Sequence, residues 1–534
     1  MDPLLFCQHR RKCKLRNNRM VYQYTENEGL MHTIQLLLKT TAYDRQVLEK
    51  RFHVVSHVHN VMVKHAKKCL VSLNHDSEYL SAKSEYCSLL KKNRLPADEK
   101  ALKKQLSAAM NTQIRKHGLS EYDFQSYIKV CAKQFRKCLS SQQIQKEATR
   151  VWKGVEDVLY GDGKDIHFKK YRDFTTICGK TNTNGAKFNK DTMTVGWLGL
   201  ELKCRIPKDS LYIIEALDSD ISYCEIKRMM FPNGWHYYVV AYLKGDAPHK
   251  LSEIGGMDNI TGVDIGTSTV ATVSDHMVTL KELAPECKKY NKRIEHLLRH
   301  LDLSRRASNP GKYNPDGTIN KSNRDRWIYT KTYLRNLNRL RSLYRQKAAY
   351  IKQCHEQMIN GLLSDSVNFI VENMTFKGMQ LRAKTTERQD KTTDIVQKDG
   401  SIKQVHKFKR KKRFGRSLND RAPASFVSIL DRKATLYGGG VYKVQTKDFK
   451  ASQYDHVEDN YKKAELKDRS KYVGGYKVQR DLYSAYLLKN SNTKFDKPDR
   501  EKCIYGFENF LKLQNNLICE MKKNNITRKQ CFGF

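Results

Sequence analysis

The hydrophobic pattern of the chain changes its period near Tyr160, and this change limits which structures each part can form. Residues 44–159 carry apolar side chains three and four positions apart, the spacing of helices. Residues 174–243 carry short β-like runs separated by turns, including SLYIIEAL, CEIKRMMF and WHYYVVAYL. We therefore expect a helical part followed by a small barrel or curled sheet.

Local signals place several elements within these two parts. Residues 31–38, MHTIQLLL, have the pattern of a single strand before the helices. Apolar residues between Phe124 and Phe135 predict one helix, and Ser140 with Gln143 forms a capping box that predicts the start of the next. The Pro-Asn-Gly at 232–234 predicts a hairpin turn.

The charge of the chain restricts its partners. Lys and Arg number 99 against 57 Asp and Glu, a net charge of +42 that is spread along all 534 residues. Such an excess favours a polyanionic partner. No apolar stretch approaches the roughly 20 residues that span a bilayer, and MDPLLFCQHRRKCK lacks the order of a signal peptide. We expect a soluble, cytoplasmic protein without a membrane partner, associated with the prokaryotic nucleoid.

Three short apolar runs lead into carboxylates at widely separated points of the chain. ITGVDIGTSTVATVS has the pattern of a β-hairpin with Asp264 near the end of its first strand. Residues 369–371 form a buried-strand pattern that ends at Glu372, and Asp481 precedes an apolar helix pattern. Only tertiary structure could bring the three side chains together.

Each carboxylate also has an ordinary explanation. Asp264 could cap the turn after its strand, Glu372 could emerge into solvent, and Asp481 could cap its helix. A charge directly after a buried run is costly to bury unless something binds it. Capping and metal binding therefore both stay open for each residue considered alone.

Taken in order, three motifs resemble those of a known family. GVDIGTSTVATVS, FIVENMTFKGM and QRDLYSAYLL resemble the three RuvC motifs of the transposon-encoded TnpB nucleases and their descendants, the compact type V CRISPR effectors. LRHLDLSRRAS after the first motif and ILDRKATLYGGGVYKVQTKDFKAS before the third extend the likeness, which covers most of residues 30–490.

This resemblance implies an RNA-guided DNA endonuclease with an RNase H-like (RuvC) nuclease domain, a helical recognition lobe and a small β-barrel wedge domain. Asp264, Glu372 and Asp481 would hold two Mg²⁺ ions, or Mn²⁺ in their place, with Asp264 bridging them. In-line hydrolysis would leave a 5′-phosphate. The partners would be a guide RNA and double-stranded target DNA with a short adjacent motif, bound by a monomer.

Pattern and resemblance together predict six segments. They are a basic N-terminal segment at 1–29, a first wedge strand at 30–43, a helical recognition lobe at 44–160, a β-barrel wedge domain at 161–258, a RuvC-like nuclease domain at 259–490 with a degenerate zinc-ribbon-like insert at about 450–475, and a C-terminal helical tail at 491–534.

The chain departs from the family pattern at three points. Residues 450–475, where most relatives have a four-cysteine zinc ribbon, contain no cysteine and only His456, so no zinc is expected there. Tyr483 stands where relatives usually have asparagine, and Asn373 stands where a second acid is common. These changes bear on the rate of the reaction more than on the existence of the site.

Basic and aromatic residues supply candidates for nucleic-acid contacts. HKFKRKKRFGR, residues 406–416, would contact a heteroduplex or form a lid over the active site, and a nuclear-localisation signal is the alternative. Tyr171 would stack on a base or pack in a core. The candidates are Tyr171, Arg305, Arg306, Lys407, Lys409, Arg410, Lys411, Lys412, Arg413 and Arg480.

Two rival functions stay open. VDIGTSTVATV also resembles the first phosphate-binding motif of sugar kinases and actin-like ATPases, and LYGGGVY resembles their adenosine-binding glycines. That function leaves the net charge, Glu372 and Asp481 unexplained. The second rival is a nuclease-inactive, RNA-guided DNA-binding repressor of the same family, against which the presence of all three acids argues.

Overall fold

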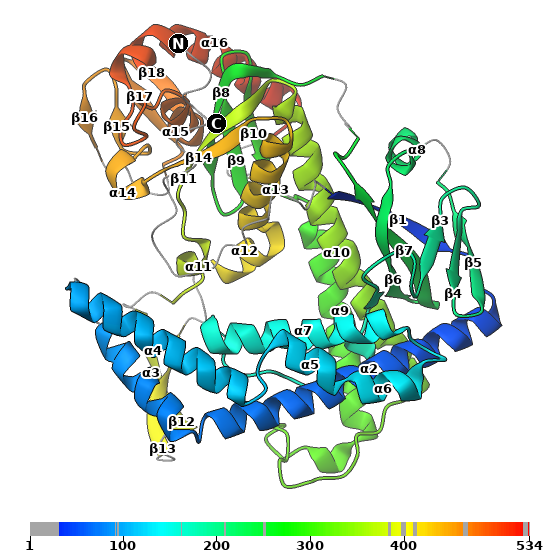
Figure 1. Ribbon diagram of the computed structural model, residues 1–534. Helices are drawn as coiled ribbons and strands as arrows, with labels where there is room; N and C mark the ends of the chain where they lie inside the picture. The colour runs from blue at the N-terminus through cyan, green and yellow to red at the C-terminus, as the bar shows by residue number, and fades with distance from the viewer. Residues whose placement is uncertain are drawn as a thin grey trace. The chain divides into compact units, whose positions relative to one another are not determined.

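The computed structural model describes residues 31–90, 92, 96–161, 163–207, 210–248, 253–382, 386–396, 402–409, 414–462, 468–526 and 532. The chain forms two compact units, residues 1–250 and 251–534 (Figure 1). Each unit combines a β-sheet with helices, which confirms the mixed α/β class. The basic segment predicted at 1–29 lies outside the described residues. Within the described ranges, no helix has the length and apolar character needed to cross a bilayer.

The first unit contains a seven-stranded sheet in the order β2-β6-β7-β1-β5-β4-β3 with antiparallel pairings. Among the described residues no pairing joins the edge strands β2 and β3, so the sheet is curled rather than closed by hydrogen bonds. The strands are β1 (Met31–Leu38), β2 (Thr176–Cys178), β3 (Lys187–Asn189), β4 (Thr194–Trp197), β5 (Leu200–Arg205), β6 (Ile221–Phe231) and β7 (Gly234–Lys244).

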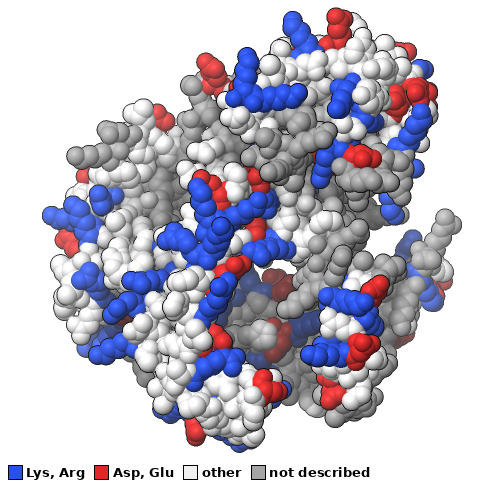
Figure 2. Space-filling view, turned by 180° about the vertical axis from the view of Figure 1, so that it is seen from behind, with Lys and Arg blue, Asp and Glu red and all other residues white. Residues whose placement is uncertain are grey.

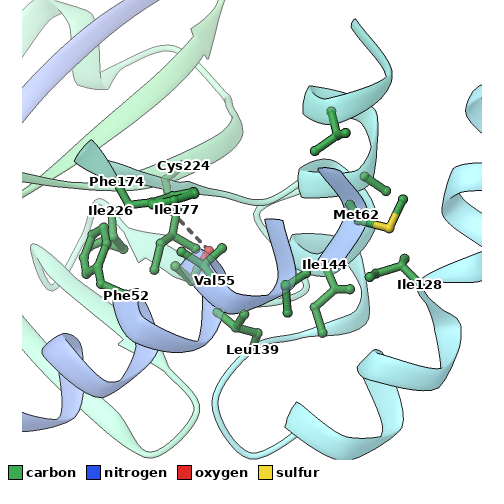
Figure 3. Packing of buried hydrophobic residues seen from close by; sticks show 14 of the residues in the cluster. Phe52, Val55, Met62, Ile128, Leu139, Ile144, Phe174, Ile177, Cys224 and Ile226 are labelled. Atoms are coloured by element: carbon green, nitrogen blue, oxygen red, sulfur yellow. Dashed lines mark hydrogen bonds between the residues drawn. The ribbon is translucent and has the colours of Figure 1, made fainter. Parts of the chain in front are cut away.

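Helix α2 (Ala42–Leu73) joins the sheet of this unit to the other helices. Figure 3 shows Phe52 and Val55 of α2 beside Phe174, Ile177 and Ile226 of the sheet region, and Met62 farther along α2 beside Ile128 and Ile144. One core therefore runs from sheet to helices. The other helices are α3 (Ser77–Leu90), α4 (Ala97–Lys116), α5 (Glu121–Tyr127), α6 (Lys129–Phe135), α7 (Ser141–Tyr160) and α8 (Leu211–Leu217).

The structure tests several local predictions. The strand at 31–38, the Ser140–Gln143 capping box at the start of α7 and the hairpin between β6 and β7 are all confirmed. The single helix predicted between Phe124 and Phe135 is instead two, α5 and α6, separated at Ile128.

The β-like prediction for SLYIIEAL is wrong, because residues 211–217 form helix α8. Tyr212, Ile213, Ala216 and Leu217 pack on the core, whereas Leu211 and Ile214 are exposed. This is a helical spacing that the β-branched pair of isoleucines conceals in the sequence.

The second unit is built on a five-stranded sheet in the order β10-β9-β8-β11-β14. Strands β8, β9 and β10 form an antiparallel meander, and β11 runs parallel to both β8 and β14. The strands are β8 (Gly256–Ile265), β9 (Thr269–Val273), β10 (Val278–Glu282), β11 (Ser366–Glu372) and β14 (Gly440–Val444).

Helices cover both faces of this sheet. One face, with Val263 and Phe369, packs on α10 (Lys331–Leu363) and α13 (Pro423–Leu436). The opposite face, with Ile370 and Val444, packs on α15 (Arg480–Lys489) and α16 (Arg500–Lys523). The remaining elements are α9 (Cys287–Ser308), α11 (Phe376–Met379), α12 (Gly415–Arg421), α14 (Thr446–Phe449) and the two-stranded pairs β12 (Arg388–Val396) with β13 (Ile402–Phe408), β15 (Tyr454–Asp455) with β16 (Asn460–Tyr461), and β17 (Ser470–Val473) with β18 (Tyr476–Gln479).

Candidate active site

Parallel pairing places Asp264 and Glu372 next to each other on neighbouring strands. Val371 of β11 is paired with Val263 of β8, so the next position along that register brings Glu372 beside Asp264. Neighbouring strands lie about 4.8 Å apart. Because side chains alternate between faces, Glu372 shares the face of Ile370, which packs on α15 and α16.

Gly262 brings α15 onto the same face. A Cβ atom at Gly262 would lie 1.9 Å from the Ala485 carbonyl oxygen and 2.4 Å from the Lys489 backbone nitrogen. The helix backbone therefore lies directly on the strand, two residues before Asp264. Asp481, one turn before Ala485 and in the first turn of α15, completes the group of carboxylates.

The three carboxylates affect one another electrostatically. Burial of its carboxyl group, followed by the negative charges of Asp481 and Glu372, raises the pKa of Asp264 well above its usual value, and the Arg480 and Arg469 charges oppose this. Burial raises the pKa of Glu372 to about 7. Both residues retain some exposed surface, but the protein around their carboxyl groups limits hydration.

The capping and solvent-exposure alternatives for Asp264, Glu372 and Asp481 do not agree with the structure. Within the described chain, no hydrogen bond to the Asp264 carboxylate is found, so Asp264 does not cap its turn. The raised pKa of Glu372 argues against free solvation. The N-cap of α15 is Gln479, whose side-chain oxygen accepts a hydrogen bond from the Leu482 N–H at 2.7 Å. Asp481 is therefore not the capping residue.

Two arginines hold the Asp481 carboxylate. Arg480 donates to one oxygen from Nη2 at 3.1 Å and Nε at 3.2 Å, and Arg469 Nη1 lies 3.4 Å from the other. Arg469 was not among the predicted site residues. No motif in the sequence points to it, because its role depends on how the β17–β18 hairpin meets α15. Gly262 was also missed, although a glycine two positions before a strand carboxylate is a usable signal for close helix packing.

The carboxylates match Mg²⁺ in chemistry, since hard oxygen donors are its preferred ligands. Their arrangement does not match it as directly, because no group of three or more His, Cys, Asp or Glu side chains in the described ranges is placed to hold a metal. The pairing of Asp481 with Arg469 and Arg480 accounts for this, since it directs the carboxylate toward guanidinium groups.

His456 and Tyr483, both singled out in the sequence, contact each other. His456 is buried, and its Nδ1 lies 2.7 Å from the Tyr483 hydroxyl, which also accepts the His456 backbone N–H at 3.2 Å. The His456 ring meets the Phe507 ring edge-on with centroids 4.6 Å apart. Aromatic packing connects the described part of residues 450–475 to α15 and α16.

His456 makes the second unit sensitive to acid. Burial lowers the pKa of His456 to about 4; the Asp455 charge opposes this shift, and the smaller effects of Lys471 and Arg500 add to it. The neutral ring is the form that packs, so its contribution is complete above the unfolded pKa near 6.5 and is lost as pH falls toward 4, by about 3 kcal/mol in total. Glu372 and Asp264, with raised pKa values, act in the opposite direction, so the measurement is the difference in free energy of unfolding between the wild type and a His456 variant, which denaturant titration at each pH should show to shrink across this window.

The His456→Gln variant should be less stable at neutral pH and show a flatter acid profile. His276→Gln, at an exposed turn in the same unit, is the matched control and should retain the wild-type profile. An equal acid dependence in the wild type and His456→Gln would contradict this assignment.

The structure also locates the predicted nucleic-acid contacts. Arg305 and Arg306, in the last turn of α9, both pair with Asp302 at 2.8 Å. Lys407 is exposed on β13, and Lys409 pairs with Glu387 at 2.7 Å. Arg410, Lys411, Lys412 and Arg413 lie outside the described residues. Figure 2 shows Lys and Arg over much of one face, interspersed with Asp and Glu.

Tyr171 is engaged within the protein. Its ring stacks on His53 with centroids 3.5 Å apart, and the Arg228 guanidinium lies 4.3 Å from the ring centroid. Its hydroxyl bonds to Glu49 and accepts from Arg228 at 2.6 Å. Burial and the Glu49 contact raise its pKa to about 12. These contacts favour the core-packing alternative for Tyr171.

No protein-family model and no curated protein matches the chain. Among solved structures, it is similar to a chain in a cryo-EM structure of a Cas12f1–sgRNA–target DNA complex, with 11% identity, a TM-score of 0.42, and coverage of 88% of this chain and 99% of that one. A chain in a CRISPR-Cas12f ternary complex has 11% identity and a TM-score of 0.24, covering 85% of this chain and 86% of that one.

Proposed function

We propose that this chain is an RNA-guided DNA endonuclease whose single RuvC-like site contains Asp264, Glu372 and Asp481. The observation that carries the proposal is the convergence of three carboxylates, far apart in sequence, on one face of the second sheet. Such a cluster of negative charge is unfavourable unless cations compensate it, and within the described residues Asp481 is the one of the three that Arg469 and Arg480 pair with directly. Its presence in a chain of net charge +42 favours metal-dependent chemistry on nucleic acid.

The topology of the second unit supports the same proposal. An antiparallel meander followed by two parallel strands, in the order β10-β9-β8-β11-β14 with helices on both faces, is the arrangement expected of an RNase H-like domain. The first unit, a curled sheet with a helical part, supports the proposed wedge and recognition functions. We further propose an origin among the TnpB nucleases or the compact type V effectors.

The three carboxylates would hold two Mg²⁺ ions, which would supply an activated water and stabilise the leaving oxygen of the phosphodiester. The negative charges of Asp481 and Glu372 both act on Asp264, so Asp264 is the proposed shared ligand. Both raised pKa values, of Asp264 and of Glu372, should fall once a cation is bound, because opposite charge favours the ionised carboxylates.

The partners follow from this chemistry. Both solved structures named above are complexes of Cas12f proteins, one of them with a single guide RNA and target DNA. We propose the same two classes of partner for this chain, with base pairing to the guide selecting the target and the protein recognising a short adjacent motif. Basic side chains would neutralise phosphates along both strands.

The rival functions explain less of the structure. Gly439 of LYGGGVY has a packing role, since a Cβ there would lie 2.0 Å from the Val367 carbonyl oxygen. A kinase would not need the Glu372 and Asp481 carboxylates beside Asp264. A nuclease-inactive repressor would have no reason to retain three acids that destabilise one another.

The deciding experiment uses the protein co-expressed with RNA from its own locus. DNA matching that RNA should be cut in Mg²⁺, and an excess of EDTA should stop cutting while binding continues. Sequencing the copurified RNA would distinguish a CRISPR guide from a transposon-derived one. Binding without cutting, in either Mg²⁺ or Mn²⁺, would support the repressor and overturn the nuclease proposal.

Arg469→Gln tests the pairing of Asp481 directly. Removing this guanidinium should free the carboxylate and raise Mn²⁺ affinity in the absence of nucleic acid, by about threefold, because a partly exposed ion pair contributes at most about 1 kcal/mol. Electron paramagnetic resonance of free Mn²⁺ measures this without any cleavage. Arg432→Gln, on exposed α13 surface, is the control. Unchanged Mn²⁺ affinity in Arg469→Gln would show that the pair does not compete with the cation.

A further inference from the structure

An open pocket in the first unit has the composition of a binding site for unpaired nucleotides. It has a volume of about 490 Å³ and is lined by Lys64, Lys67, Lys68, Val71 and Ser72 of α2 together with Phe168. The five α2 residues recur at three- and four-residue spacing, so they share one helix face. The volume is in the range of small-ligand sites and is enough for one or two nucleotides.

Phe168 is held in place although its ring is exposed. Two residues earlier, Ile166 is buried against α7, near Gly154. One residue later, the Lys169 backbone exchanges two hydrogen bonds with the Asn60 side chain of α2, at 2.9 and 3.0 Å. Phe168 itself is 56% exposed. The segment is therefore anchored on both sides of an aromatic ring that stays accessible.

The lysines beside this ring are largely uncompensated. Lys67 pairs with Asp165 at 2.8 Å, which also ties the Phe168 segment to α2. Lys64 and Lys68 are exposed, and neither has a carboxylate partner within the described ranges. The pocket therefore has a net positive charge next to a flat apolar surface.

We propose that this pocket binds an unpaired segment of nucleic acid, with a base stacked on Phe168 and its flanking phosphates at Lys64 and Lys68. A nucleotide combines an anionic group and a flat ring in one unit, which matches both features of the pocket. A base inside a duplex cannot present its face, so the site discriminates unpaired from paired strands. The site lies in the first unit and uses none of the carboxylates of the second, so its test is independent of cleavage.

The test uses the full chain and a short, unstructured, fluorescently labelled oligouridylate. Phe168→Leu should weaken its affinity about tenfold, because stacking on an aromatic side chain is worth about 1–3 kcal/mol per base. Phe168→Trp should retain the affinity and show fluorescence quenching that the wild type lacks. Tyr505→Leu, which removes a 94% exposed aromatic side chain from α16, is the matched control and should bind like the wild type.

A second pair of variants tests the lysines. Lys64→Gln with Lys68→Gln should reduce the slope of log affinity against log salt by about 1.4, since each phosphate contact on a single strand contributes about 0.7. Phe168→Leu should leave that slope unchanged. Affinity for a blunt duplex should not depend on Phe168.

Three results would overturn the proposal. They are equal oligouridylate affinity in wild type and Phe168→Leu, absence of added quenching in Phe168→Trp, and an equal loss of duplex binding in Phe168→Leu. If only the binding of an oligoglutamate competitor fell in Phe168→Leu, the pocket would instead belong to an acidic peptide. Thermal unfolding should be unchanged in all variants, because the substituted side chains are exposed.

Discussion

Exchanging Asp264 for asparagine is expected to abolish DNA cleavage while nucleic-acid binding persists. Asparagine keeps the shape of the side chain but removes the charge at the centre of the carboxylate group, where Asp481 and Glu372 both act on it. Loss of a shared metal ligand should cost about 4 kcal/mol of transition-state stabilisation, roughly a thousandfold in rate. Single-turnover cleavage of guide-matched DNA measures the rate, and electrophoretic mobility measures binding.

The same variant should be more stable than the wild type when no divalent metal is present. Its raised pKa means that the ionised form of Asp264 destabilises the folded state at neutral pH, and a neutral isostere removes that cost. The melting temperature of Asp264→Asn should therefore rise in EDTA. Asp258→Asn, at an exposed position on the same strand, should change neither property. Undiminished cleavage by Asp264→Asn would remove Asp264 from the active site.

Gly262→Ala is expected to have the largest effect on stability. The added methyl group would lie 1.9 Å from the Ala485 carbonyl oxygen, and because both contacting atoms belong to backbone, no side chain can move to relieve the overlap. Helix α15 would have to leave the sheet, taking with it the buried Leu482, Leu487 and Leu488. We expect a loss of at least about 3 kcal/mol in the free energy of unfolding.

Helix displacement should also separate Asp481 from the other two carboxylates and so reduce cleavage even in folded molecules. Gly256→Ala, on the same strand but with no atom closer than 3.5 Å to the new methyl group, is the matched control and should be close to neutral. Thermal unfolding and limited proteolysis measure the two variants side by side. Wild-type stability of Gly262→Ala would contradict the close contact of α15 with β8.

The elements that the sequence predicted correctly are those whose signal is local. The capping box at Ser140 and the hairpin after Phe231 depend on neighbouring residues, and both are present. The strand prediction for SLYIIEAL was wrong. Adjacent isoleucines favour a strand, but the residues that are buried in the folded chain have a helical spacing. The composition of this segment favours a strand, whereas its packing on the core stabilises a helix.

The candidate site was predictable only in part, for a related reason. Asp264, Glu372 and Asp481 each end or begin a recognisable apolar run, so they could be chosen as candidates from the sequence. Their mutual electrostatics and the pairing of Asp481 with Arg469 arise from contacts between distant segments, which no spacing in the sequence encodes. The binding assignments of the basic residues and the proposed domain boundaries stay predictions.

In many proteins a bound metal both holds a domain together and supports activity. In this chain, aromatic packing around His456 makes the structural contacts. Where thiolate-bound zinc holds a domain together, a chelator removes structure and activity at once. Here Tyr483, Phe507 and Phe510 form the aromatic cluster around His456, and aromatic rings and hydroxyl groups do not respond to chelation. Chelator treatment should therefore leave these aromatic contacts in place, and any loss of stability in EDTA should come from the carboxylates around Asp264.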